Sequence, residues 1–198
     1  MDPVNDTNDD RTLLAGIRSG DDAAFRALVE RFQDMVYNTC LGLLQNREDA
    51  EDTAQDVFIK VHQSAKGFRG DARLSTWIYR IAVTASLDLL RSRKRKKRFA
   101  IVQSLFGTPE TEEIADRSPF AHPGVALENK ERAAVLFRAM ATLPEHQRVA
   151  FTLHKVEGLS YQEIGEILQT TVPAVESLMH RAKENLRERL ADYYQDQQ

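Results

Sequence analysis

The chain has 198 residues, of which 42% are hydrophobic and 29% are charged, and this composition is typical of a globular protein rather than of a disordered one. It has no apolar run near the roughly 20 residues that span a bilayer, and its acidic, polar first residues are unlike a secretory signal. Cys40 is the single cysteine, which excludes an internal disulfide, argues against a cysteine-based zinc site and favours a reducing cytosol. We interpret Cys40 as a small buried apolar residue.

The net charge of −3 is distributed unevenly along the chain. Residues 1–59 carry 5 basic and 13 acidic side chains, for a net charge of −8. Residues 60–98 carry 12 basic and 2 acidic side chains, for +10, and residues 99–198 carry 10 and 15, for −5. A concentrated basic stripe matters more for nucleic-acid binding than the total charge does. Residues 60–98 are therefore the first candidate for such a surface.

Two predicted helices open the first block of the chain, residues 21–98. Asp21 or Asp22 caps the first helix, and apolar residues follow at three- and four-residue spacing. Asn46 opens the second helix, because the carboxylates in its first turns suit the positive end of the helix macrodipole. We interpret residues 1–20 as an N-terminal segment outside this block.

A third predicted helix carries the basic stripe. Residues 66–71 include two glycines and predict a loop, after which Ser75 or Thr76 begins a long helix with an apolar stripe. That helix runs into Arg91–Arg98, where seven of eight residues are basic. Such runs are common in nucleic-acid patches and also in solvated tails.

Aromatic side chains alternate with cations around the loop and the start of this helix. The residues concerned are Phe68, Arg69, Arg73, Trp77, Tyr79 and Arg80. Aromatic rings stack on unpaired bases while arginines hold the phosphate backbone, so the mixture is typical of a single-strand site. Trp77 also borders the apolar stripe, so burial in the core is an equal alternative from periodicity alone.

Beyond this block the helical pattern is interrupted and then resumes. Residues 99–126 are acidic and contain prolines and glycines, which indicates a linker, although 99–106 could form a short apolar helix. Residues 127–190 form a second helical block, and 191–198 form a tail. With no strand pattern and no internal repeat, we predict an all-α fold: two helical domains joined by a flexible acidic linker, the second containing a helix-turn-helix.

The helix-turn-helix pattern lies within residues 158–190. Ser160 and Glu163 form a capping box at the start of a short helix. Gly165 lies where two steeply crossing helices require a small residue, and Thr171 can cap the second helix. An antiparallel helix pair with a solvated polar face is the alternative interpretation.

The second helix of this motif presents a polar face. Its members are Pro173, Ala174, Glu176, Ser177, His180, Arg181 and Lys183. Arg181 and Lys183 suit phosphates, whereas Ser177 and His180 are placed to reach base edges. Glu176 either accepts a hydrogen bond from a cytosine amino group or simply favours the helix N-terminus.

These motifs, in this order, resemble the sigma-70 family of bacterial RNA polymerase sigma factors, specifically the extracytoplasmic-function group with regions two and four only. Asp49–Phe58 resembles region 2.2, and Phe68–Asp71 with Ser75–Ala82 resembles regions 2.3 and 2.4. The stretches that resemble region 4 are Leu143–Glu145, Gly158–Ile164 and His180–Lys183.

The resemblance implies three functional surfaces. The first docks on the clamp helices of the polymerase β′ subunit through Asp49, Asp52, Gln55 and Asp56. The second melts and reads the minus-ten element through Phe68, Arg69, Arg73, Ser75, Thr76, Trp77, Tyr79, Arg80, Thr84 and Arg91. The third reads the minus-thirty-five element, in a region that also touches the β flap, through Ser160, Tyr161, Pro173, Ala174, Glu176, Ser177, His180, Arg181 and Lys183. Thr84 stands where relatives often have Asn and Glu176 where many have Lys or Arg, and both departures bear on which promoter is read.

The resemblance further implies core RNA polymerase, duplex and single-stranded promoter DNA and a cognate anti-sigma factor as partners. It implies a cytoplasmic bacterial protein, which an anti-sigma factor can also hold at the inner membrane, with no cofactor and no small-molecule substrate. An autonomous helix-turn-helix regulator is the main alternative, but it does not explain a basic stripe in the other block. An enzyme is disfavoured, because the five histidines lack zinc-ligand spacing and no phosphate loop or nucleophile motif is present.

Overall fold

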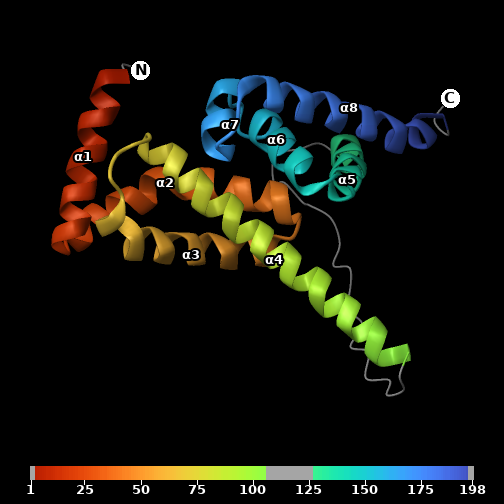
Figure 1. Ribbon diagram of the computed structural model, residues 1–198, viewed down its shortest axis with the longest axis horizontal. Coiled ribbons are helices and arrows are strands. Elements are labelled where there is room, and N and C mark those ends of the chain that lie inside the picture. The colour runs from red at the N-terminus through yellow and green to blue at the C-terminus, as the bar shows by residue number, and fades with distance from the viewer. Residues whose placement is uncertain (1–2, 106–126, 196–198) are drawn as a thin grey trace.

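The computed structural model of the chain describes residues 3–105 and 127–195, and all regular structure in these two ranges is helical (Figure 1). This confirms the all-α prediction. In the structure the first block also takes in the N-terminal segment, so it contains α1 (Pro3–Ser19), α2 (Asp22–Leu44), α3 (Arg47–Ser64), the short 3-10 helix η1 (Ala65–Gly67) and α4 (Leu74–Leu105). The second block contains α5 (Leu127–Ala141), α6 (Glu145–Lys155), α7 (Tyr161–Leu168) and α8 (Val172–Gln195). None of the helices in the described ranges is long and apolar enough to cross a membrane.

Local capping explains where α2 and α3 begin. The Asp21 side chain accepts a hydrogen bond from the amide of Ala23 at 2.8 Å, and the Asn46 side chain accepts one from the amide of Asp49 at 3.0 Å. Both satisfy amides that have no partner within the helix. Cys40 is fully buried in α2, as predicted, and burial raises the pKa of its thiol to about 11.

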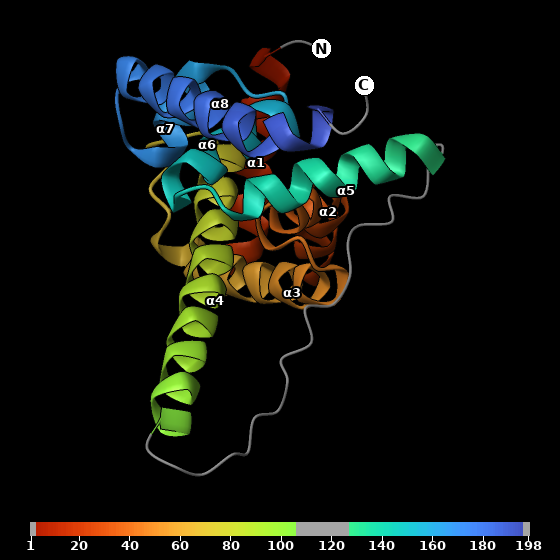
Figure 2. The ribbon, with the colours of Figure 1, turned by 90° about the vertical axis from the view of Figure 1, so that its right-hand side faces the viewer.

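Helix α4 differs from its prediction at both ends. It begins at Leu74, slightly before the expected Ser75 or Thr76, and it continues to Leu105, beyond the expected boundary at residue 98. The stretch 99–105 contains no glycine or proline, so nothing in it interrupts the helix. The distal part of α4 extends away from the packed body (Figures 1 and 2). The rest of the predicted linker lies outside the described residues.

The N-terminal segment is a helix, which the sequence analysis did not predict. Leu14 and Ile17 of α1 are buried in the first core. A Cβ added at Gly16 would lie 2.5 Å from the Cβ of Ala24, so α1 and α2 approach each other closely at this glycine. Apolar residues are sparse among the polar ones of α1, which makes its apolar face difficult to recognise from periodicity.

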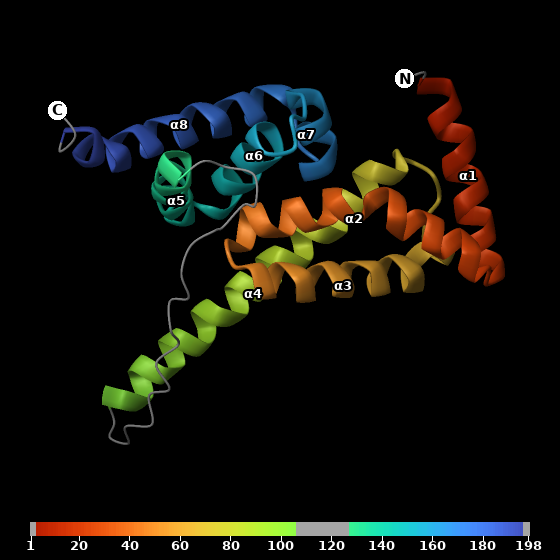
Figure 3. The ribbon, with the colours of Figure 1, turned by 180° about the vertical axis from the view of Figure 1, so that it is seen from behind.

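The two helical blocks pack against each other, as Figure 3 shows for α2 beneath α6. One hydrophobic core lies within α1 to α4, but the second core contains residues from both blocks. The first block contributes Leu43, Tyr79, Val83 and Leu87 to it. A Cβ at Gly42 would lie only 2.6 Å from Cγ2 of Thr152, so α2 and α6 are in close contact there.

A buried arginine joins the blocks near this contact. Arg148 of α6 is 5% exposed, and its guanidinium donates to the carbonyls of Ala141 at 2.7 Å and Leu143 at 3.2 Å. The same group reaches the carbonyl of Leu43, in the last turn of α2, at 3.5 Å. Two of these acceptors, Ala141 and Leu43, lie at the C-terminal ends of helices, where carbonyls lack helical partners and favour a cation, and Leu143 lies just beyond α5. Burial lowers the pKa of Arg148 from its ordinary value.

Candidate nucleic-acid and polymerase interfaces

The helix-turn-helix of the second block has the predicted local structure. The Glu163 carboxylate accepts from the Ser160 amide at 2.9 Å and from the Ser160 hydroxyl at 2.7 Å, while the Glu163 amide donates to that hydroxyl oxygen at 3.3 Å. These hydrogen bonds lower the pKa of Glu163. A Cβ at Gly165 would lie 3.0 Å from the carbonyl oxygen of Thr170, so the turn itself requires the small residue. The Thr171 hydroxyl caps α8 by accepting from the amide of Ala174 at 3.4 Å.

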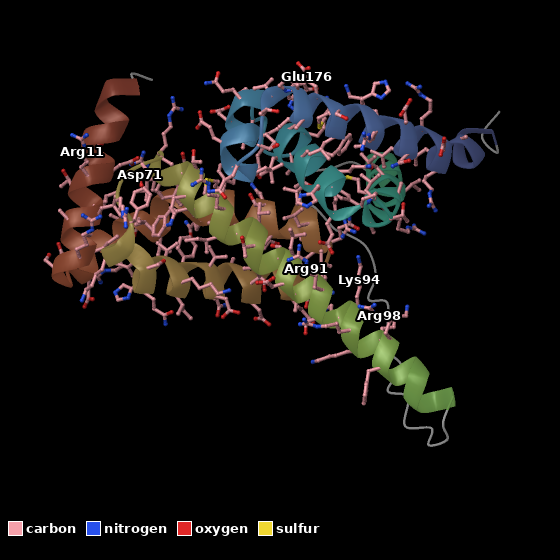
Figure 4. The ribbon with its side chains drawn as sticks, viewed as in Figure 1. Arg11, Asp71, Arg91, Lys94, Arg98 and Glu176 are labelled. Atoms are coloured by element: carbon pink, nitrogen blue, oxygen red, sulfur yellow. The ribbon has the colours of Figure 1, made fainter. Side chains whose placement is uncertain are left out.

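The polar face of α8 is open to solvent. Exposed residues on it are Pro173, Glu176, Ser177, His180, Arg181 and Lys183, and Ala174 is half-buried. Glu176 lies on the side of α8 turned away from the first block (Figure 4). His180 lies 3.3 Å from Glu184, one turn along the helix. At the start of α7, the ring of half-buried Tyr161 packs beside His154 at 5.0 Å. The polar face of α8 is therefore accessible in this structure, with Arg181 and Lys183 among its exposed side chains.

The aromatic residues before and within α4 form a stacked pair. The rings of Phe68 and Trp77 lie 4.6 Å apart with an interplanar angle of 26°. Both are half-buried and pack against the first core. Trp77 therefore packs against the core without being fully buried, and its role in binding single strands stays a prediction. Of the neighbouring candidates, Arg69, Arg73 and Thr84 are exposed, Ser75 is half-buried and Thr76 is buried.

Other members of the predicted minus-ten set face the second block in this structure. Tyr79 is 7% exposed, and its hydroxyl donates to the carboxylate of Glu157 at 2.9 Å. Arg80 donates to the carbonyl of Glu166 at 2.7 Å. Burial of both partners, Tyr79 and Glu157, raises the pKa of each. These two α4 side chains thus have hydrogen-bond partners in the second block, Tyr79 in the turn after α6 and Arg80 in α7.

Carboxylates of the second block also pair with cations along α4. Glu145 lies 3.0 Å from Arg91 and 3.7 Å from Lys94, and both cations are labelled in Figure 4. Glu163 lies 3.9 Å from Arg73. Exposed pairs of this kind contribute little to stability individually. They show, however, that acidic groups of α6 and α7 neutralise part of the face that sequence analysis assigned to DNA.

The predicted polymerase-docking face on α3 is mostly open, with one exception. Asp52, Gln55 and Asp56 are exposed. Asp49 is different, because its side chain is only 17% exposed and pairs with Arg93 of α4. Ile59, which the sequence analysis passed over, is 53% exposed on the same helix. The sequence could have identified Ile59 as a member of this face, because it lies one helical turn after Asp56 and two turns after Asp52.

Among the side chains that the structure describes, no three His, Cys, Asp or Glu residues lie close enough together to hold a metal ion. The arrangement is instead one of helical surfaces: a solvent-facing recognition helix, a basic helix flanked by stacked aromatics, and an acidic face with an exposed isoleucine. These features define a helical protein built to bind nucleic acid and other macromolecules.

Comparison with known proteins identifies the family. The profile described as Sigma-70 region 2 matches residues 28–96, and that described as Sigma-70, region 4 matches residues 127–186. The RNA polymerase sigma-H factor of Pseudomonas aeruginosa is 32% identical over 185 residues, covering 88% of this chain and 90% of the relative. The ECF RNA polymerase sigma factor SigW of Bacillus subtilis is 33% identical over 180 residues, covering 89% and 94% respectively.

Solved structures show the same fold. CnrH, in complex with the cytosolic domain of CnrY, superposes with a TM-score of 0.65 at 23% identity, covering 93% of this chain and 98% of CnrH. The sigma factor RpoE from Bartonella quintana, in complex with the anti-sigma factor NepR, gives 0.61 at 20% identity, covering 84% and 96%. The chain belongs to the sigma-70 family, in the extracytoplasmic-function group that carries regions two and four. It is a transcription initiation factor that binds core RNA polymerase and promoter DNA.

Proposed function

We propose that this sigma factor uses three separate surfaces: α3 for core polymerase, the loop and α4 of the first block for the minus-ten element, and α8 for the minus-thirty-five element. The observation that carries the proposal is the Phe68–Trp77 stack, near the exposed Arg69 and Arg73. Its tryptophan lies in the first turn of α4, the helix that carries the basic run Arg91–Arg98. Stacking platforms beside cations are the usual means of holding unpaired bases. At the level of whole blocks, we assign promoter melting to the block of α1–α4, which also carries the polymerase surface on α3, and duplex recognition to the block of α5–α8.

The proposed mechanism is binding alone, and the chemistry of RNA synthesis remains with the polymerase. Extruding a base from the duplex costs a few kcal/mol, and stacking on an aromatic side chain offsets about 1–3 kcal/mol per base. Duplex contacts by α8 hold the promoter in register while the bases downstream are captured. No residue of this chain needs to form or break a covalent bond in this scheme.

The packed arrangement of the two blocks bears on when DNA can bind. Tyr79, Arg80 and Arg91 are engaged by the second block, so we infer that these residues reach the minus-ten element only after the blocks separate. A protein that holds the blocks together would therefore inhibit transcription. Because CnrH and RpoE were solved bound to CnrY and to the anti-sigma factor NepR, we propose a cognate anti-sigma protein for this chain, acting on it in the cytoplasm.

Docking on core polymerase gives the first test. Replacing Asp52 and Asp56 with lysine should weaken core-polymerase binding at least tenfold, because reversing charges at an interface introduces repulsion of several kcal/mol. Replacing Ile59 with alanine should also weaken it, since exposed apolar side chains at the centre of an interface often dominate its affinity. Asp34→Lys, an exposed charge reversal on α2, is the matched control. Unchanged capture of core enzyme by a variant with an unchanged circular dichroism spectrum would remove α3 from the docking surface.

Duplex recognition gives the second test. Replacing Arg181 and Lys183 with alanine should weaken binding to minus-thirty-five DNA and lower the slope of affinity against salt by about two ions, because two fewer phosphates are neutralised. Arg189→Ala, an exposed cation farther along α8, is the control and should change neither quantity. Glu176→Lys should change the bases selected from a randomised promoter pool. Selection of the same sequence by the Glu176 variant would exclude that residue from base readout.

A mobility-shift experiment separates this function from an autonomous regulator. If the chain shifts promoter DNA with high affinity only when core polymerase is present, the sigma-factor mechanism accounts for it. A specific high-affinity shift by the chain alone would instead favour independent operator binding through the helix-turn-helix.

A further inference from the structure

Helix α1 precedes the residues matched by the region 2 profile, yet it has a defined place in the first block. Leu14 and Ile17 are buried in the first core. In the middle of the helix, Asp10 lies 2.9 Å from Arg31 of α2. These contacts orient α1 so that its last turn, which contains Arg18, lies against the segment that follows α3.

The guanidinium of Arg18 holds the backbone of that segment. Its Nε donates to the carbonyl oxygen of Ala65 at 3.1 Å, and its Nη2 donates to the carbonyl oxygen of Phe68. These two carbonyls stand at the beginning of η1 and immediately after its end. A planar guanidinium can bind two acceptors at once in a fixed geometry. One side chain from α1 therefore fixes both ends of this turn.

The position of Phe68 matters because its ring stacks on Trp77, the single tryptophan of the chain. The loop between them contains Gly70 at a φ of +81°, a conformation that glycine adopts readily. A glycine-containing loop has many accessible paths, and ordering one of them has an entropic cost. An anchor at the Phe68 carbonyl limits those paths before any DNA arrives.

We propose that Arg18 is a positioning residue for promoter melting, which fixes the Phe68 carbonyl so that Phe68 and Trp77 form a preformed platform for an unpaired promoter base. This inference rests on the function proposed above for that face. Preformation strengthens binding because less conformational freedom is lost when the base is captured. It gives α1 a role in melting without any contact with DNA.

The position of the loop can be measured without DNA or polymerase, because all tryptophan fluorescence of the full chain comes from Trp77. In Arg18→Ala, the emission should shift to longer wavelength and acrylamide should quench it more strongly, while the far-ultraviolet circular dichroism stays unchanged. Arg18→Gln keeps one amide donor and should give an intermediate signal. Arg11→Ala removes the same charge from an exposed site nearer the start of α1 and should leave the emission unchanged (Figure 4).

The consequence for melting is measured with core polymerase and a duplex promoter. Arg18→Ala should form about tenfold fewer open complexes, the loss expected for one hydrogen bond from a charged donor. A pre-melted bubble template should largely restore transcription, because opening is then no longer required. Arg11→Ala should behave like the unaltered chain on both templates.

The possible results separate the positioning role from the function on which it rests. Unchanged Trp77 quenching in both Arg18 variants would overturn the proposal, because the loop would not depend on the guanidinium. Altered quenching with normal promoter opening would also overturn it, provided that Trp77→Ala is impaired in opening. If Trp77→Ala itself opens promoters normally, the platform function fails first, and the Arg18 proposal fails with it. Should Arg18→Ala unfold, Arg18→Gln, which keeps most of the side chain, decides between the same outcomes.

Discussion

Trp77→Ala is expected to bind core polymerase and to form the closed promoter complex, but to open duplex promoters roughly fivefold to a hundredfold less well, as stacking worth about 1–3 kcal/mol per base implies. The reason is the half-buried Trp77, whose ring stacks on Phe68 near the exposed Arg69 and Arg73. Permanganate reactivity of unpaired thymines measures opening directly. Transcription from a pre-melted bubble should be close to normal, because the base pairs that the platform helps to open are already broken.

The bubble template also separates melting from folding. Phe25→Ala is the matched control, because Phe25 is another half-buried aromatic of the first core, packed edge-on against His62 at 4.9 Å. It should lower thermal stability to a similar degree without a selective defect on duplex templates. Equal loss of activity on duplex and bubble by a helical, polymerase-bound Trp77→Ala would deny Trp77 a specific part in melting. Loss of cooperative unfolding in that variant would show instead that the residue serves the core.

Gly42→Leu is expected to separate the two blocks and so to increase minus-ten binding by the free chain. A Cβ at Gly42 would lie 2.6 Å from Cγ2 of Thr152, on α6, and 3.7 Å from Cγ2 of Val156, the residue that follows α6. The three atoms nearest that Cβ all belong to the second block, so the added side chain meets that block first. Leucine also favours a helix over glycine by nearly 1 kcal/mol, which should preserve α2.

The expected gain in minus-ten binding follows from the fraction of molecules in which the two blocks are separated. Raising that fraction from about a tenth to about nine-tenths would tighten apparent binding to forked minus-ten DNA about ninefold. Small-angle scattering should show a larger radius of gyration, whereas Asn38→Leu, an exposed site one turn earlier on α2, should change neither property. Binding of minus-thirty-five duplex should not change, because the polar face of α8 is already exposed. An unchanged radius, or an equal gain on both DNAs, would mean that packing of the blocks does not control the minus-ten face.

Local features of this protein were predictable from sequence because their causes are local. The caps at Asp21, Asn46 and Ser160 involve groups within three residues of one another, so spacing alone identifies them. The solvent-facing side of α8 likewise follows from helical periodicity, because the apolar residues that pack into the second core recur every three or four positions along the helix. Even the continuation of α4 past residue 98 was accessible, because no helix breaker interrupts the sequence there.

Whether neighbouring candidate residues on α4 are exposed or buried depends instead on the tertiary structure. Trp77 and Tyr79 carry the same signal in sequence, an aromatic residue among arginines, yet Trp77 stays partly exposed while Tyr79 is buried against Glu157. The side of α4 that packs against the second block is set by contacts such as Tyr79–Glu157, whose residues are 78 positions apart in the sequence. Helical periodicity carries no information about contacts over that separation.

The sequence by itself therefore determined every long helix except α1, together with the helix-turn-helix and the family, because caps, periodicity and motif order are properties of short segments. Only the tertiary structure decided which predicted residues are free to meet DNA or polymerase. In the folded chain, Asp49 pairs with Arg93 and Arg80 donates to a carbonyl of α7. Arg18 of the N-terminal helix donates to the carbonyl of Phe68. Each of these contacts joins segments distant in the chain, and such pairs are selected by how the helices pack rather than by the residues adjacent to them.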